Sequence, residues 1–70
     1  MNIRSNMSGS LWKVLVNVGD QVDAGQEVAI LESMKMEIPI VSEATGLVEA
    51  ILKNEGDFVQ EDELVVRLQG

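Results

Sequence analysis

Apolar residues along the chain fall into short segments of strand length, and turn residues separate them. Valine and leucine dominate these segments, which suits a pleated and half-buried surface. No window of ten or more residues shows the three-to-four spacing of an amphipathic helix. Ile3 could open a first strand, and the other expected strands are 11–18, 21–22, 28–33, 36–42, 47–52, 58–59 and 64–68. The pattern therefore predicts an all-β chain.

The two halves of the chain repeat this pattern at an offset of 37 positions. Positions that are identical at that offset include the eight pairs Gly9/Gly46, Leu15/Leu52, Asn17/Asn54, Gly19/Gly56, Asp20/Asp57, Val22/Val59, Val28/Val65 and Leu31/Leu68. The chain is therefore interpreted as a duplicated unit. Two such units, related by an approximate two-fold axis, would bury each other's apolar faces. The stretch between them would protrude as a hairpin, and it contains Lys35.

Strict alternation fails at the same place in both halves. Leu11 and Val14 are an odd number of residues apart, as are their counterparts Val48 and Ile51. If all four face inward, a bulge or sharp bend lies within each pair, and such bends let a small sheet curl. We therefore expect residues 1–70 to form one domain, a flattened eight-stranded barrel of two four-stranded antiparallel sheets with quasi-two-fold symmetry.

One turn differs between the halves, because Gly25 aligns with Asp62. If the backbone φ angle is positive there, glycine adopts it freely while aspartate is strained. Trp12, the only tryptophan, is expected to be a partly buried strand residue that covers an end of the small core.

Composition narrows the class of protein. The chain has 12 acidic and 5 basic residues, a formal net charge of −7, and its cations are scattered, which argues against a nucleic-acid partner. Such acidity either provides solubility or steers the protein towards enzymes with basic docking surfaces. The longest apolar run, 28–31, is too short to cross a membrane, and the N-terminus lacks the apolar region of a signal peptide. We expect a cytoplasmic protein with no membrane partner, and a monomer on its own.

The sequence offers little for catalysis. There is no cysteine and no histidine, so disulfides and a Cys/His zinc site are excluded. The serines lack an obvious base, and catalysis through Ser33 and Lys35 would need a buried, neutral lysine. The acidic run 61–63 lacks the ligand spacing of a calcium loop and is interpreted as a solvated turn. We expect no catalytic residues and no metal.

Lys35 is distinguished by its position between Met34 and Met36. An exposed lysine amine is almost wholly protonated at pH 7, so its acylation needs an activated donor and a base that another enzyme supplies. The alternative is a solvated lysine that interrupts a hydrophobic hairpin. The two methionines are poor turn formers but make an adaptable recognition surface. Their alternative is inward packing as strand residues.

The stretch Glu32-Ser33-Met34-Lys35-Met36 resembles the biotinyl domains of biotin-dependent carboxylases, whose hallmark is a Met-Lys-Met triplet preceded by a small residue and often a glutamate. The Gly-Asp-x-Val pattern at 19–22 and 56–59 extends the resemblance over nearly the whole chain. A chain of this size is similar to the small biotin/lipoyl attachment proteins. Two departures are Ser33 in place of the usual alanine, and 5–9 without the prolines of the family's Ala-Pro-Met-Pro-Gly.

The resemblance implies a carrier that is not itself an enzyme. Biotin would be joined covalently to Lys35 by a biotin protein ligase that uses biotinyl-adenylate. The biotin would then shuttle a carboxyl group between biotin carboxylase and carboxyltransferase sites. Recognition by the ligase would involve the residues around the lysine, which are Glu32, Ser33, Met34 and Met36.

Two alternatives stay open. A lipoyl carrier shares the implied fold, but its usual motif is Asp-Lys-Ala, and a glutamate at the position of Glu32 disfavours lipoylation; modification by both cofactors remains an alternative. The second alternative is an unmodified β-barrel interaction module. Intact mass separates the three, because biotin, lipoate and no adduct give different masses.

Overall fold

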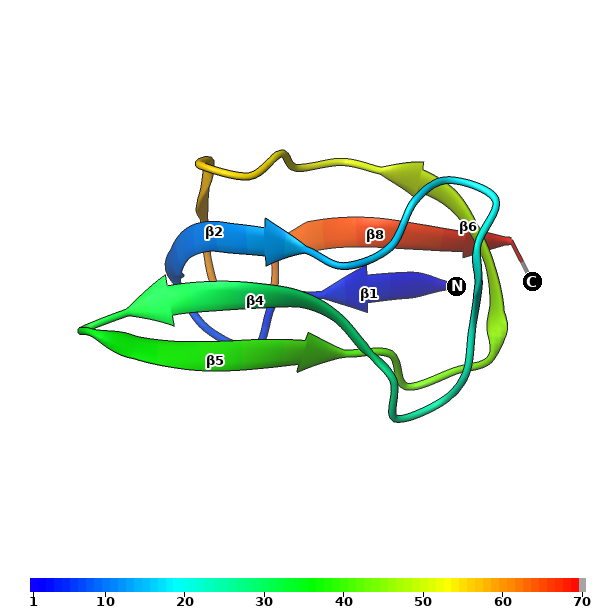
Figure 1. Ribbon diagram of the computed structural model, residues 1–70, viewed down its shortest axis with the longest axis horizontal. Coiled ribbons are helices and arrows are strands. Elements are labelled where there is room, and N and C mark those ends of the chain that lie inside the picture. The colour runs from blue at the N-terminus through cyan, green and yellow to red at the C-terminus, as the bar shows by residue number, and fades with distance from the viewer. Residues whose placement is uncertain (70) are drawn as a thin grey trace.

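The computed structural model describes residues 1–69, which form eight strands and no helix (Figure 1). The strands are β1 (Asn2–Arg4), β2 (Gly9–Val14), β3 (Gln21–Val22), β4 (Glu27–Ser33), β5 (Met36–Val41), β6 (Gly46–Ile51), β7 (Phe58–Val59) and β8 (Leu64–Gln69). They make two four-stranded antiparallel sheets with the orders β1-β8-β6-β3 and β5-β4-β2-β7. The all-β prediction is confirmed. Gly70, the last residue of the predicted domain, lies outside the described residues.

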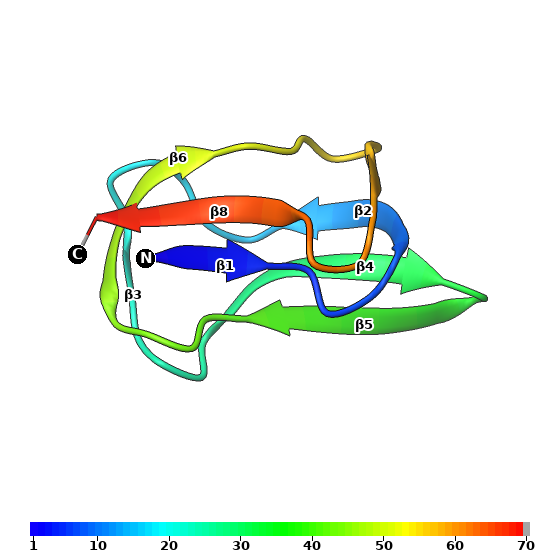
Figure 2. The ribbon, with the colours of Figure 1, turned by 180° about the vertical axis from the view of Figure 1, so that it is seen from behind.

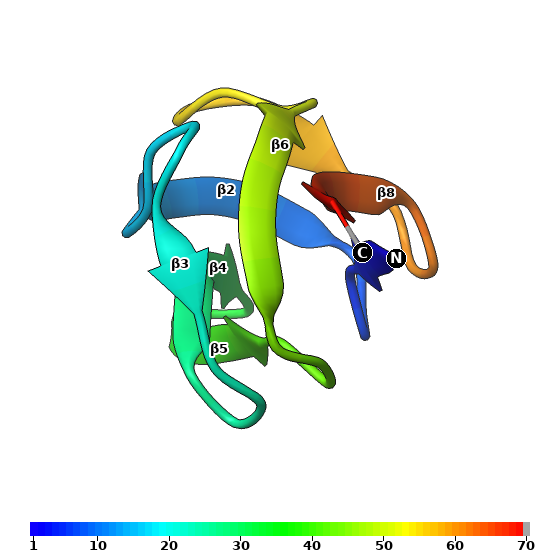
Figure 3. The same ribbon diagram turned by 90° about the vertical axis from the view of Figure 1, so that its right-hand side faces the viewer.

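The core lies between the two sheets, and the strands surround it when the molecule is viewed from one end (Figure 3). It consists almost entirely of valine, leucine and isoleucine, and its members are Ile3, Leu11, Val16, Val22, Val28, Ala29, Leu31, Ile40, Val48, Val59, Val65, Val66 and Leu68. Trp12 is not among them and is 44% exposed, so the prediction that it covers an end of the core is wrong. Its indole instead lies beside the Lys13 amine, 5.5 Å from the ring centroid to Nζ.

The two halves are related as the repeat predicts. Advancing each strand of one sheet by four positions in the strand numbering gives the order of the other sheet. The turn bonds repeat as well, since the Asn17 amide donates to Asp20 Oδ2 and the Asn54 amide donates to Asp57 Oδ2, both at 2.8 Å. The duplicated-unit interpretation is confirmed.

Both predicted bends are present. The pairing of β2 with β4 shifts register between Leu11 and Lys13, and the pairing of β6 with β8 shifts between Val48 and Ala50. Because of these bulges, Val14 can pack against the core although an alternating strand would turn it outward. The first long strand ends at Val14 rather than continuing to residue 18, because the chain leaves the sheet and buries Val16.

Backbone geometry explains which residue types fit at two further positions, the turn position shared by Gly25 and Asp62, and Gly9. Gly25 and Asp62 have φ angles of 88° and 69°, so the prediction of positive φ at this turn is confirmed in both halves. Gly9 is needed for a different reason, since a Cβ atom added there would lie 2.7 Å from the Glu32 carbonyl oxygen. The absence of a side chain lets β2 approach β4 closely at the base of the hairpin that contains Lys35.

Candidate functional site

The predicted hairpin consists of β4 and β5, and its loop is as short as a hairpin loop normally gets. Ser33 pairs with Met36, so only Met34 and Lys35 lie between the strands. Both have positive φ, 52° and 64°, which is the arrangement of a type I′ turn. This turn matches the right-handed twist of the two strands, and it directs the loop away from both sheets.

Neither residue in this turn is suited to its backbone. Type I′ turns strongly prefer sequences such as Asn-Gly, because an L-residue with a long side chain in the left-handed region costs roughly 1–2 kcal/mol. The pairing of β4 with β2 on one side and β5 on the other holds the conformation in place. Strained residues that persist in this way are typical of functional positions.

The side chains of the loop lie in solvent. Met34 is 92% exposed and Met36 is 63% exposed, so the reading in which they pack inward is wrong and the exposed reading is confirmed. Lys35 is exposed between them. Within residues 1–69 the only ion pair joins Lys53 Nζ to Glu63 Oε2 at 2.7 Å, which leaves the Lys35 amine free of any carboxylate.

The remaining predicted site residues lie at the end of β4. Glu32 is exposed and Ser33 is half-buried, next to the close approach of Gly9. The structure also brings in Glu37, which sequence reasoning missed, because it pairs directly with Glu32 across the hairpin. Two like charges in this arrangement destabilise a hairpin. Counting outward from a two-residue loop at Met34 and Lys35 would have revealed this pair.

The hairpin projects from one end of an elongated molecule, 33 × 19 × 18 Å along its principal axes (Figures 1 and 2). β1 starts and β8 ends at the opposite end, where the Met1 amino group donates to the Leu68 carbonyl oxygen at 2.9 Å. A group attached to the loop would therefore extend away from the body of the domain, from the start of β1 and from the end of β8.

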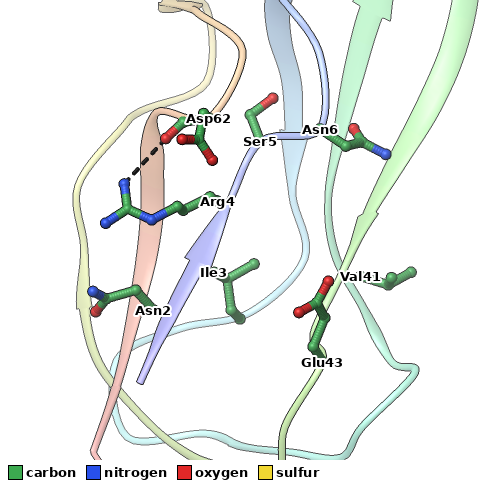
Figure 4. A pocket seen from close by; sticks show the side chains of 8 residues that line it. All are labelled: Asn2, Ile3, Arg4, Ser5, Asn6, Val41, Glu43 and Asp62. Atoms are coloured by element: carbon green, nitrogen blue, oxygen red, sulfur yellow. Dashed lines mark hydrogen bonds between the residues drawn. The ribbon is translucent and has the colours of Figure 1, made fainter.

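Other polar features of the protein lie elsewhere. A cavity of about 270 Å³ is bordered by Arg4, Glu43 and Asp62, beside the end of β5 that is remote from the loop (Figure 4). Arg4 Nη1 donates there to the Asp62 carbonyl oxygen at 3.1 Å. The part of the chain that the structure describes contains no cluster of acidic, histidine or cysteine side chains able to hold a metal ion.

The acidic run 61–63 takes part in hydrogen bonds and an ion pair that stabilise the turn in which it lies. The Gln60 amide donates to Glu63 Oε1 at 2.8 Å, and this hydrogen bond, followed by the contact with Lys53, lowers the pKa of the Glu63 carboxyl. The same contact with Glu63 raises the pKa of the Lys53 amine. These interactions stabilise a solvated turn, which agrees with the interpretation from the sequence.

Comparisons with known proteins agree with this geometry. The family model described as "Biotin-requiring enzyme" matches residues 1–68. The chain is 56% identical over 68 residues to the biotin/lipoyl attachment protein of Bacillus subtilis (strain 168), covering 97% of this chain and 93% of that one. It is 36% identical over 64 residues to the "Biotinylated protein TB7.3 homolog" of Mycobacterium leprae (strain TN), with 91% and 90% covered.

Among solved structures, the urea carboxylase of Kluyveromyces lactis superimposes with a TM-score of 0.92 and 36% sequence identity, over 99% of this chain. The chain spans only 6% of that much longer carboxylase. No helix that could cross a membrane occurs within residues 1–69. By its family match and its full-length relatives, the chain belongs to the biotin/lipoyl attachment family, and it is a carrier domain similar to the biotinyl domains of carboxylases.

Proposed function

We propose that Lys35 is the residue that carries the cofactor, and that the cofactor is biotin. The observation that carries this proposal is the placement of a single lysine on a strained two-residue loop, exposed and flanked by exposed methionines, at the end of the molecule opposite the start of β1 and the end of β8. None of the other four cations lies on this loop: Arg4, Lys13 and Arg67 belong to β1, β2 and β8, and Lys53 lies between β6 and β7.

The modification is an acyl transfer in which this protein is the substrate. The Lys35 nitrogen attacks the carbonyl carbon of biotinyl-adenylate, the bond from that carbon to the phosphate oxygen breaks, and AMP leaves. The amine must first lose a proton to a base, and no carboxylate side chain within residues 1–69 pairs with it. A biotin protein ligase therefore supplies both the base and the activated donor. The neutral amide changes the net charge from −7 to −8.

The surroundings of Lys35 suit recognition by such a ligase. Met34 and Met36 offer flexible apolar side chains that adapt to a partner surface. Glu32 carries a charge that its neighbour Glu37 repels rather than neutralises, and a basic group of the ligase would relieve this repulsion. Ser33 is small enough to leave the base of the loop uncovered. We assign all four residues, Glu32, Ser33, Met34 and Met36, to ligase recognition.

Biotin is favoured over lipoate for two reasons. One full-length relative is named as biotinylated, and the closely superimposing structure is a urea carboxylase, although the Bacillus subtilis relative is named for both cofactors. The loop also carries Met-Lys-Met, not the Asp-Lys-Ala of lipoyl domains. With biotin in place, the projecting loop would carry a carboxyl group between a biotin carboxylase site and a carboxyltransferase site. A cytoplasmic location and a monomeric state remain predictions.

The test is the intact mass of the whole chain after co-production with a biotin protein ligase and biotin. We expect one biotin per chain on the unaltered protein and none on Lys35→Arg, which keeps the charge but removes the acylatable amine. Lys13→Arg and Lys53→Arg are the matched controls and should be modified fully. Biotin retained on Lys35→Arg would show that another lysine is the attachment site. A lipoyl adduct that forms in competition with biotin would show that biotin is the wrong choice of cofactor.

A further inference from the structure

All of the sulfur in this protein is placed at the surface. The chain contains four methionines and no cysteine. The exposed fractions are 59% for Met1, 39% for Met7, 92% for Met34 and 63% for Met36, and no methionine belongs to the core. An exposed methionine adds nothing to the packing of the core, so the fold itself gives no reason for a methionine on each side of Lys35.

We propose that Met34 and Met36 form a reversible oxidation site that controls acylation of Lys35. This inference rests on the proposed function, because it concerns access of the ligase to the same loop. A peroxide such as hydrogen peroxide is the oxidant, and a thiol-dependent methionine sulfoxide reductase is the enzyme that reverses the change.

The chemistry balances within these two reagents. The thioether sulfur gives two electrons to the peroxide, the O–O bond breaks, one oxygen atom joins the sulfur and the other leaves as water. In the reverse step two thiols are oxidised to a disulfide, and the sulfoxide oxygen leaves as water. The methionine side chain returns to its original state, so the loop can pass through the cycle repeatedly.

Oxidation changes what the loop offers to a partner. A thioether is apolar and flexible, whereas a sulfoxide is polar and chiral. When the ligase covers the loop to reach Lys35, a sulfoxide loses its bound water, and a polar group buried without a matching donor reduces binding by about tenfold or more. Unoxidised methionines carry no such penalty on binding, since burying an apolar side chain against the ligase is favourable.

Oxidation leaves the fold unaffected. The core is built from valine, leucine, isoleucine and alanine, so a sulfoxide introduces no polar atom into it. The Met34 and Met36 side chains make no contribution to the packing between the sheets, and the backbone of the turn is held by β4 and β5. A change in acylation should therefore occur without a change in thermal midpoint.

The exposures also predict an order of reaction. Met34, almost fully in solvent, should be oxidised first, and Met7, the least exposed, should be oxidised last. Met1 resembles Met36 in exposure but lies at the opposite end of the molecule, so its oxidation should have no effect on acylation. Peptide mass mapping across a time course of peroxide treatment distinguishes the four sites.

The experiment compares initial rates of biotinylation before and after treatment of the whole chain with hydrogen peroxide, which catalase removes before the ligase is added. We expect kcat/KM to fall about tenfold or more and to recover after incubation with methionine sulfoxide reductases and a thiol. The thermal midpoint should be the same for both forms. Untreated protein that accepts no biotin would contradict the proposed function, whereas equal rates for the oxidised and untreated forms would overturn this inference alone.

Substitutions identify the residues responsible. The double variant Met34→Leu with Met36→Leu keeps an apolar loop that peroxide cannot oxidise, and its ratio of treated to untreated rate should stay near one. Met7→Leu, the matched control, should lose acylation on treatment as the unaltered protein does. Met34→Gln with Met36→Gln imitates the polar form and should be accepted poorly without any peroxide. The assignment of the oxidation site to Met34 and Met36 would be refuted by either of two results. One is a double leucine variant whose biotinylation rate falls as far on peroxide treatment as that of the control, and the other is a glutamine variant that is biotinylated at the normal rate.

Discussion

The turn at Met34 and Lys35 should be less stable than the same hairpin with an ordinary turn sequence. The backbone of each of these residues lies in the left-handed region, which costs a residue with a side chain roughly 1–2 kcal/mol of conformational energy. Met34→Asn with Lys35→Gly installs the pair that type I′ turns prefer. Asparagine recovers part of the cost and glycine all of it, while the extra freedom of glycine in the unfolded chain takes back roughly 0.5–1 kcal/mol. The free energy of unfolding should rise by about 1–2 kcal/mol.

Thermal and urea unfolding, followed by circular dichroism, measure this change. For a domain of this size 1 kcal/mol corresponds to roughly 4–8 °C, so the midpoint should increase by about 5–15 °C. Met7→Asn is the control, since Met7 is also exposed but has no positive φ, and its effect should be within about 0.5 kcal/mol. An unchanged or lower midpoint for the double variant would show that the loop stores no strain. The variant would also lack the proposed acyl acceptor, so under the proposed function the gain in stability would come at the expense of function.

Two further substitutions test the fold. Asp62→Gly should leave the midpoint unchanged or raise the free energy of unfolding by up to about 1 kcal/mol, because φ is 69° there, and a clear drop on thermal unfolding would contradict this. Gly9→Ala should destabilise the domain by about 1–3 kcal/mol in urea unfolding, because its Cβ would meet the Glu32 carbonyl oxygen at 2.7 Å. Ser10→Ala, one position along the same strand, is its control and should be nearly neutral.

Much of the fold could be predicted from local signals. Strand segments, turn glycines and the repeat at 37 positions are properties of short stretches, so they indicated the class, the symmetry and the bulge beyond Leu11 without coordinates. Trp12 was misplaced for a physical reason. It lies within the bulge, where alternation no longer predicts which face a side chain occupies, and the structure leaves it 44% exposed.

The candidate site was predictable as a stretch but not as an arrangement. The five predicted residues are consecutive, from Glu32 to Met36, so any hairpin at that point brings them together. Whether the methionines faced the core or the solvent depended on the register between β4 and β5, which no local pattern specifies. The same register placed Glu37 opposite Glu32.

The sequence by itself determined a duplicated β unit and a single lysine at the connection between its copies, because alternation and turn chemistry act over a few residues. The tertiary structure alone decided that Met34 and Lys35 occupy left-handed backbone conformations, that both methionines of the loop lie in solvent, and that Gly9 lies against the Glu32 carbonyl group. These features arise where strands far apart in the chain pair in one register. Burial of a shared core selects that register, and the loop takes the conformation that the paired strands impose.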